Sequence, residues 1–177
     1  MNHFWKHLLR GLLWLLGSEM LCLILAFSLA ILPDHPAVRI IGLLFGLSAH
    51  VLMLGSCAQK AAADDVVMYR SSKVKTKFYK ILLIAAILML PSVVTYLILA
   101  ANADSILLMN LFPLLNAPFI RIYQFLTGGS DTFSAVSSSA RILAAFPPLM
   151  TAAAYTVGYY SRYLPAVAAL DARSNRT

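Results

Sequence analysis

The chain has 177 residues, of which 60% are hydrophobic and only 12% are charged, and its mean hydropathy is +0.79. Soluble domains carry about 25% charged residues, so this composition excludes an ordinary soluble domain and indicates a membrane protein. Lysine and arginine outnumber aspartate and glutamate by 14 to 7. In a membrane protein such an excess is first a sign of topology, and we expect no nucleic acid partner.

Four apolar blocks are each close to the ~20 helical residues that a bilayer core needs. They cover residues 11–32, 40–58, 81–101 and 142–164. Four spans leave no room for a separate soluble domain, so we predict one polytopic membrane domain over residues 1–177. The predicted fold class is an all-α integral membrane protein, a four-helix transmembrane bundle in contact with the lipid bilayer.

The first block has the features of a retained helix. Lys6, His7 and Arg10 precede it, as basic residues precede the apolar part of a secretory signal. The apolar run is longer than the ~7–15 residues of a signal, and three more spans follow. We therefore expect it to stay in the protein and to turn back into the second block at residues 33–36, where two prolines break the helix.

Glu19 and His50 are the carboxylate and the histidine that lie inside the apolar blocks. Each is 15 or 16 residues from His35 in the turn, so the two lie at similar depth in an antiparallel hairpin. An unpaired charge at that depth costs at least ~2.5–3.5 kcal/mol. We predict an intramembrane polar pair of Glu19 and His50. This pair would act as a proton relay, or it would only hold two helices together. The third alternative is that Glu19 reaches the membrane interface by itself and forms no pair with His50.

A basic segment at residues 60–80 follows the second block. It carries six cations against Asp64 and Asp65, which we interpret as a solvated acidic pair. This segment, the N-terminal tail and the C-terminal region together hold 11 of the 14 cations. All 11 lie on one side of the membrane if both termini do. The positive-inside rule then predicts cytoplasmic N- and C-termini. The short loops suit a bacterial inner (plasma) membrane.

Four lysines of this segment stand close to the third block: Lys73, Lys75, Lys77 and Lys80. Near a membrane surface each cation attracts anionic lipid headgroups by about 1 kcal/mol. A site for anionic lipids is therefore one interpretation, and a topology determinant without a ligand is the other.

Residues 105–126 form a further apolar segment that does not fit a simple span. It is long enough to cross the membrane, but two prolines and an arginine disfavour a single spanning helix. We predict an interfacial or re-entrant segment, which covers the bundle or docks another membrane subunit. As a fifth span it would place the C-terminus outside. The residues concerned are Asn110, Pro113, Asn116, Pro118 and Arg121.

Tyr155, Tyr159 and Tyr163 recur every four residues and so share one face of the last predicted helix. Tyr159, Tyr160 and Tyr163 stand near the predicted cytoplasmic end of this helix, where tyrosines are typical of the aromatic belt at the membrane interface. The alternative is an aromatic wall for a substrate or a partner helix. We also expect Pro91 to kink the third helix and Pro147-Pro148 the fourth.

No pattern in the chain predicts catalysis or a bound group. Enzymes need a nucleophile with its base, a metal triad or paired carboxylates, and none of their usual motifs occurs. Cys22 and Cys57 stand alone inside spans, so we expect no metal and no cofactor. The predicted function is a non-enzymatic accessory or structural subunit of a larger membrane complex, bound to another membrane protein or to copies of itself. The alternative is a small oligomeric transporter or channel that uses a Glu–His proton relay.

Overall fold

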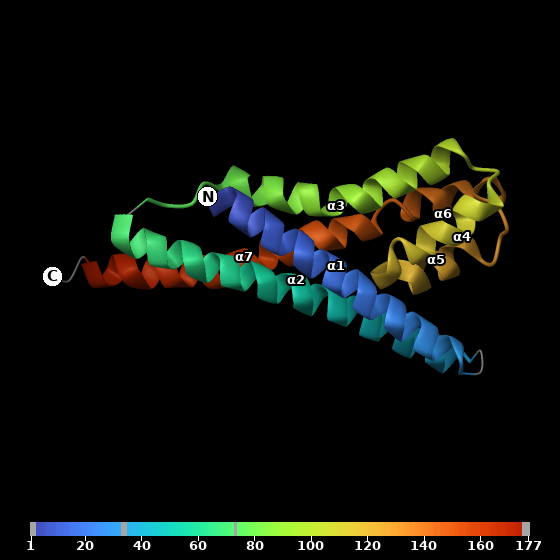
Figure 1. Ribbon diagram of the computed structural model, residues 1–177, viewed down its shortest axis with the longest axis horizontal. Helices are drawn as coiled ribbons and strands as arrows, with labels where there is room; N and C mark the ends of the chain where they lie inside the picture. The colour runs from blue at the N-terminus through green and yellow to red at the C-terminus, as the bar shows by residue number, and fades with distance from the viewer. Residues whose placement is uncertain (1–2, 33–34, 73, 175–177) are drawn as a thin grey trace.

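The computed structural model describes residues 3–32, 35–72 and 74–174, and that part of the chain contains helices but no strand. Four segments are long and apolar enough to cross a membrane. They are α1 (His3–Ala30), α2 (Pro36–Ser72), α3 (Phe78–Ala101) and the pair α6 (Ser138–Leu143) with α7 (Pro147–Ser174) (Figure 1). The predicted four-helix membrane fold is confirmed.

The two ends of the molecule differ in charge and in architecture. The N-terminus of α1, the C-terminal part of α2, the start of α3 and the end of α7 lie at one end (Figure 1). We call it the basic end. Among the described residues nine of the twelve lysines and arginines belong to it, and three belong to elements at the other end. The nine are Lys6, Arg10, Lys60, Arg70, Lys75, Lys77, Lys80, Arg162 and Arg173.

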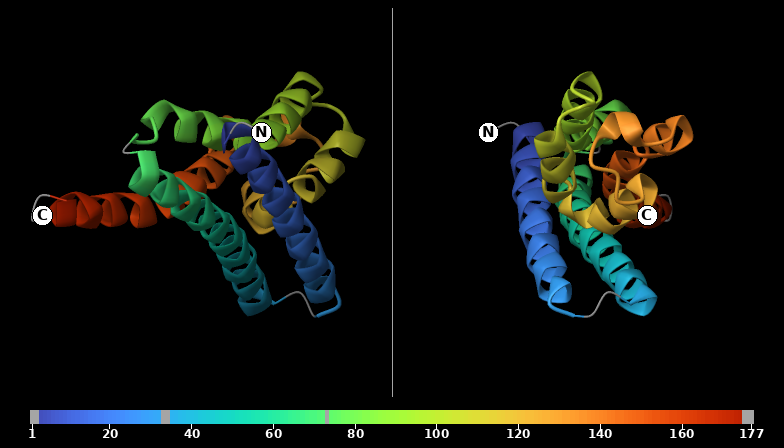
Figure 2. Two further views of the ribbon diagram at one scale, coloured as in Figure 1. Left: turned by 60° about the vertical axis from the view of Figure 1, so that its left-hand side comes forward. Right: turned by 90° about the vertical axis from the view of Figure 1, so that its right-hand side faces the viewer.

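α2 and α3 both pack on α7, and α1 packs on α2 and α3. α2 makes its most extensive contact with α7 and its next with α1, while α3 packs on α7 and α1. Figure 2 shows α1 and α2 as an antiparallel hairpin in which the C-terminal end of α1 and the N-terminal end of α2 project together from the end of the molecule opposite the basic end. One apolar core joins α1, α2, α3 and α7, and a second core gathers the end of α3 with the short helices of the far end.

The segment between α3 and α6 is a bent pair of helices. α4 (Ile106–Leu114) meets η1 (Ala117–Phe119) and α5 (Ile120–Thr127) at 95°. Pro113 and Pro118 flank the bend, because proline cannot supply the N–H that continues a helix. Asn116 lies buried at the bend and its side chain donates to the Phe112 carbonyl at 2.9 Å. The additional segment is therefore where the sequence predicts it, and its bend favours a re-entrant loop or a broken span over a straight helix.

Two boundaries differ from the prediction. α2 continues to Ser72 through an alanine-rich stretch, since alanine is the best helix former. The predicted basic loop is therefore mostly helix. The fourth span is interrupted between α6 and α7, and Pro147 and Pro148 stand directly after this break, in the first turn of α7, where a missing N–H costs nothing. Pro91 does lie inside α3.

Candidate functional site

A cluster of polar side chains lies buried at the basic end. Asp65 accepts hydrogen bonds on both carboxylate oxygens: His7 Nε2 lies 2.9 Å from Oδ1, and the Tyr159 hydroxyl and the Thr76 hydroxyl lie 2.6 and 2.9 Å from Oδ2. We call these four residues the Asp65 cluster. Asp65 is only 6% exposed and His7 only 3%. The cluster joins α1, α2 and α7 with the connection before α3.

The interpretation of Asp64 and Asp65 as a solvated pair is wrong for Asp65. Because α2 runs on past the apolar block, the two neighbours point about 100° apart around the helix. Asp64 faces outward and is held by Lys6 and Arg10, each at 3.1 Å. Asp65 faces α1 and α7 and is enclosed. The cations nearest to the cluster are therefore already paired with Asp64.

A second polar cluster crosses the middle of the bundle. His50 of α2 is completely buried and lies between Ser18 of α1 and Thr151 of α7, with Nδ1 at 3.0 Å from the Ser18 oxygen and Nε2 at 2.9 Å from the Thr151 oxygen. The Ser18 hydroxyl donates to the Leu15 carbonyl at 2.8 Å. His50 Nδ1–H must therefore donate to Ser18, and Nε2 accepts from Thr151, which assigns the tautomer. We call these three residues the His50 cluster.

Glu19 has a different partner from the one the sequence predicts. It is half-buried, and its carboxylate accepts the backbone N–H of Ala117 at 2.9 Å, which fastens the bent pair to α1. Among the hydrogen bonds of the described residues none joins Glu19 to His50. The residue beside His50 is Ser18, one position earlier, because successive side chains on a helix point about 100° apart.

The three tyrosines of α7 lie inside the bundle. Tyr155 and Tyr159 are fully buried and Tyr163 is 4% exposed, so the aromatic-belt interpretation does not fit them. Tyr159 and Tyr163 stack with ring centroids 5.2 Å apart, and the Tyr163 hydroxyl accepts the Thr76 backbone N–H at 2.8 Å. The Tyr155 hydroxyl is buried and without a hydrogen-bond partner within the described part of the chain. It lies between the Asp65 cluster and the His50 cluster along α7.

The lysines of the basic segment serve different contacts. Lys75 forms an ion pair with Asp171 at 3.3 Å and lies over the Tyr69 ring, whose hydroxyl donates to the same carboxylate. Lys77 lies over the Tyr79 ring at 6.0 Å. Lys80 is exposed in the first turn of α3. Lys73 lies outside the described residues, and the anionic-lipid site stays a prediction.

An open groove follows the seam between α2 and α7. Its first part, about 530 Å³, lies between Val51 and Gln59 of α2 and faces α7 from Met150 to Ser161. Its second part, about 550 Å³, continues toward the basic end as far as Val67 of α2. The two parts share Gln59 and Ser161. We call the whole the α2–α7 groove.

Small residues form the floor of the α2–α7 groove. The backbones of the two helices meet there so closely that a Cβ added to Gly158 would lie 2.6 Å from the Cα of Gly55. Ala153 and Ala154 continue this surface along α7. Such small residues let helix backbones approach within a membrane, and here they leave a hollow above the contact.

One further set of side chains has the chemistry of a metal site. One ligand atom of each of His3, His7 and Asp65 can be chosen so that all three lie within 4.8 Å of one another. Sequence reasoning missed this set and the Asp65 cluster. The four-residue spacing of the two histidines is visible in the sequence, but their approach to Asp65 depends on the continuation of α2.

Comparisons of the chain with models of protein families, with curated proteins and with solved structures find no match. Composition, the four apolar spans and the bent pair define the class as a multi-pass helical membrane protein.

Proposed function

We propose that the chain is a non-enzymatic accessory subunit of a larger membrane complex, and that a transmembrane helix of its partner lies in the α2–α7 groove. The continuous groove is the observation that carries the proposal. Val51 and Val67 of α2 are 16 residues apart, or about 24 Å along a helix. The groove therefore follows α2 from Val51 in the apolar block to Val67 in the extension beyond Ala58, and a partner helix lying along it would leave the membrane together with α2.

The side chains that line the groove favour a helix over lipid as its occupant. Ser56 and Gln59 are exposed in it. Hydrocarbon offers no hydrogen-bond partner to such groups, whereas a neighbouring helix does. The floor of glycine and alanine lets the second helix come close.

Charge favours a different protein over a second copy as the partner. Arg162 lines the groove toward the basic end and is exposed. The acids that this chain has at the basic end, Asp64, Asp65 and Asp171, already bind its own cations, histidine and hydroxyls. A second copy would therefore bring mostly positive charge to Arg162, while a helix with an acidic residue near its end would complement it.

The burial of the His50 cluster supports a role outside catalysis. Ser18, His50 and Thr151 include a hydroxyl and an imidazole at hydrogen-bond distance, but all three are at most 1% exposed. A substrate would have to open the bundle to reach them. Their hydrogen bonds to one another join three helices, which is the role that polar side chains commonly have in membrane bundles.

Purification in mild detergent from the membranes in which the chain is made tests the partner. We expect a second membrane polypeptide at a constant ratio. The double variant Ala153→Trp/Val157→Trp fills the groove and should remove that polypeptide, while Leu97→Trp on the exposed surface of α3 should retain it. A chain that purifies alone, as a homo-oligomer, or with the same polypeptide in both variants would overturn the proposal.

A proton-conducting protein is the second candidate, and the buried tyrosine favours it. Thr151, Tyr155, Tyr159 and Tyr163 place four hydroxyls at four-residue intervals along α7, and Tyr155 stands unpartnered between the two polar clusters. Water at that point would connect them. Liposomes containing the wild type would then dissipate a pH gradient, and those containing Tyr155→Phe would not. Equal proton leak from both would remove this candidate.

We infer from the charge distribution that the basic end is cytoplasmic, as expected for a bacterial inner-membrane protein. Both described ends of the chain lie at the basic end (Figure 1). A compartment-sensitive reporter fused to either terminus should therefore report the cytoplasm. Binding of anionic headgroups by Lys77 and Lys80 belongs to the same proposal, since both would then face the negatively charged leaflet.

A further inference from the structure

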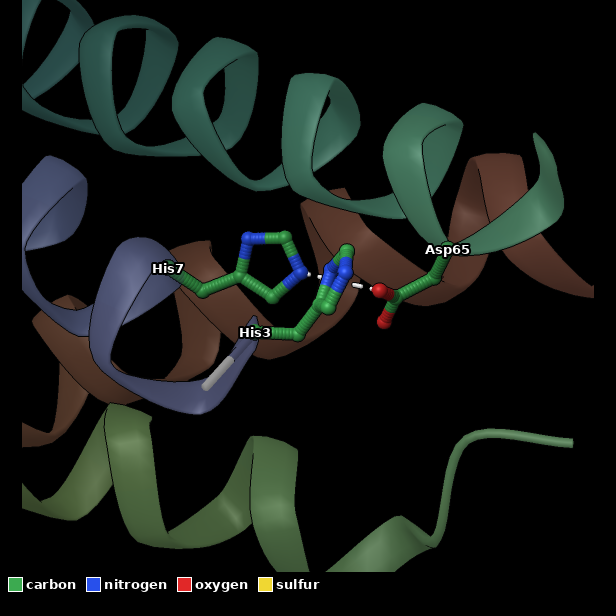
Figure 3. Close-up of side chains that lie close together, drawn as sticks. All are labelled: His3, His7 and Asp65. Carbon is green, nitrogen blue, oxygen red and sulfur yellow. Dashed lines mark hydrogen bonds and ion pairs between the residues drawn. The ribbon is translucent and has the colours of Figure 1, made fainter. Parts of the chain in front are cut away.

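Two histidines and an aspartate converge at the basic end (Figure 3). His3 and His7 are four residues apart on α1, so their side chains share one face of the helix. This spacing is the one by which a helix presents two imidazoles to a single metal ion. Asp65 approaches the same point from α2, and one ligand atom from each residue lies within 4.8 Å of the other two.

The distances suit coordination. His7 Nε2 and Asp65 Oδ1 are 2.9 Å apart. Two ligand atoms at about 2.1 Å from a zinc ion lie roughly 3.0–3.4 Å apart for angles of 90–109°. Only His3 must move closer, and it is exposed at the start of α1, where a change of rotamer meets little resistance.

Asp65 is already oriented as a metal ligand would be. The hydroxyls of Tyr159 and Thr76 bind Oδ2, which leaves Oδ1 directed at the histidines. Hydrogen bonds of this kind to a ligating carboxylate fix its direction and strengthen metal sites. Lys6 and Arg10, the nearby cations, are bound to Asp64.

We propose that His3, His7 and Asp65 bind a divalent transition-metal ion of the Zn²⁺ type. On binding, the ion takes the place of the proton on His7 Nε2: an imidazolium releases that proton to solvent, and a neutral imidazole carries it on Nδ1 instead. Two imidazoles and one carboxylate favour such an ion over Mg²⁺ or Ca²⁺, which prefer all-oxygen ligands. Three protein ligands leave at least one position open beside the exposed His3, so the ion exchanges with solvent. The site is independent of any partner in the α2–α7 groove.

The experiment measures Zn²⁺ binding to the full chain in detergent, purified with a histidine-free tag and freed of metal with a chelator. The chain has four histidines in all, His3, His7, His35 and His50, so the background is small. We expect one equivalent of Zn²⁺ to bind by titration calorimetry. We also expect Co²⁺ to give the visible absorption of a nitrogen- and oxygen-ligated ion, and bound Zn²⁺ to raise the unfolding temperature.

Two exposed histidines give a matched pair of variants. His3→Ala removes a ligand without disturbing the core and should weaken Zn²⁺ binding by about 10-fold or more, since even outer partners of a ligand are worth ~10–100-fold. His35→Ala, directly before α2 and also exposed, should bind as the wild type does. Tyr159→Phe should weaken binding while Tyr160→Phe, whose ring is half-buried, should not.

Three results would overturn the proposal. The first is no Zn²⁺ uptake by a wild-type chain that is folded by its helix content. The second is equal affinity in His3→Ala and His35→Ala. The third is displacement of Zn²⁺ by millimolar Mg²⁺, which would indicate a site for hard cations.

Discussion

His50 is enclosed by three helices, so both of its ring nitrogens depend on hydroxyls from other parts of the chain. Ser18 and Thr151 supply them, at 3.0 and 2.9 Å. The sequence predicts Glu19 as the residue of α1 that meets His50, whereas the contact is made by Ser18. The sequence cannot decide between Ser18 and Glu19, because that choice depends on the rotation of α1 about its axis.

A double-mutant cycle separates the two candidates for the contact with His50. Ser18→Ala and His50→Ala should be coupled by roughly 0.6–1.7 kcal/mol, the range found for hydrogen bonds between membrane helices. Glu19→Gln and His50→Ala should be additive within about 0.3 kcal/mol, because Glu19 binds the Ala117 N–H instead. Unfolding in one detergent provides the measurement. Coupling confined to Glu19 and His50 would contradict the geometry described for Ser18.

At the scale of the elements, the spans could be predicted and their ends could not. Hydropathy marks the part of a helix that meets lipid, and it ends near Ala58 in the second block. α2 itself continues to Ser72, so its 37 residues measure about 55 Å. Nothing in the hydropathy distinguishes a helix that continues into water from a loop. The error matters, because the continuation carries Asp65.

The contact of α2 with α7 depends on one glycine more than on the other. A Cβ on Gly158 would lie 2.6 Å from the backbone of Gly55, whereas a Cβ on Gly55 would have its nearest neighbour, the Ala154 carbonyl oxygen, at 3.9 Å. We expect Gly158→Ala to lower the free energy of unfolding by about 1–3 kcal/mol through overpacking.

Gly55→Ala is the control for Gly158→Ala, since it makes the same chemical change in the same pair of helices. It should leave the free energy of unfolding within about 0.5 kcal/mol of the wild type, as substitutions away from tight contacts do. Thermal or denaturant unfolding of both variants in the same detergent compares them. Equal losses would mean that the two backbones do not meet at Gly158.

In the molecule as a whole, the distribution of charge distinguishes the two ends of the bundle better than any sequence motif does. The described cations gather at the basic end, and the acids there are bound to them or to buried side chains. The bent pair covers the opposite end and is fastened by Glu19 and Asn116. Its position follows from the prolines and asparagine in the sequence. Its contact with α1 does not, because it joins residues 98 positions apart.

The open groove is what remains once these internal contacts are made. Polar groups inside the bundle are largely bound to one another, whereas the seam of α2 and α7 is hollow and lined by apolar side chains, small residues and a few polar ones. A helix that fills this seam would be found beside the chain in the membrane.

Photocrosslinking in intact membranes tests this claim most directly. A photoreactive residue at Leu52, Ser56 or Val157, all of which line the groove, should form an adduct of one mass with a second membrane protein. Arg162→Glu should weaken that adduct. The same probe at Leu13 or Leu97, exposed on other helices, should form none. Adducts with lipid alone, with a second copy alone, or equally from all five positions would contradict a partner helix in the α2–α7 groove.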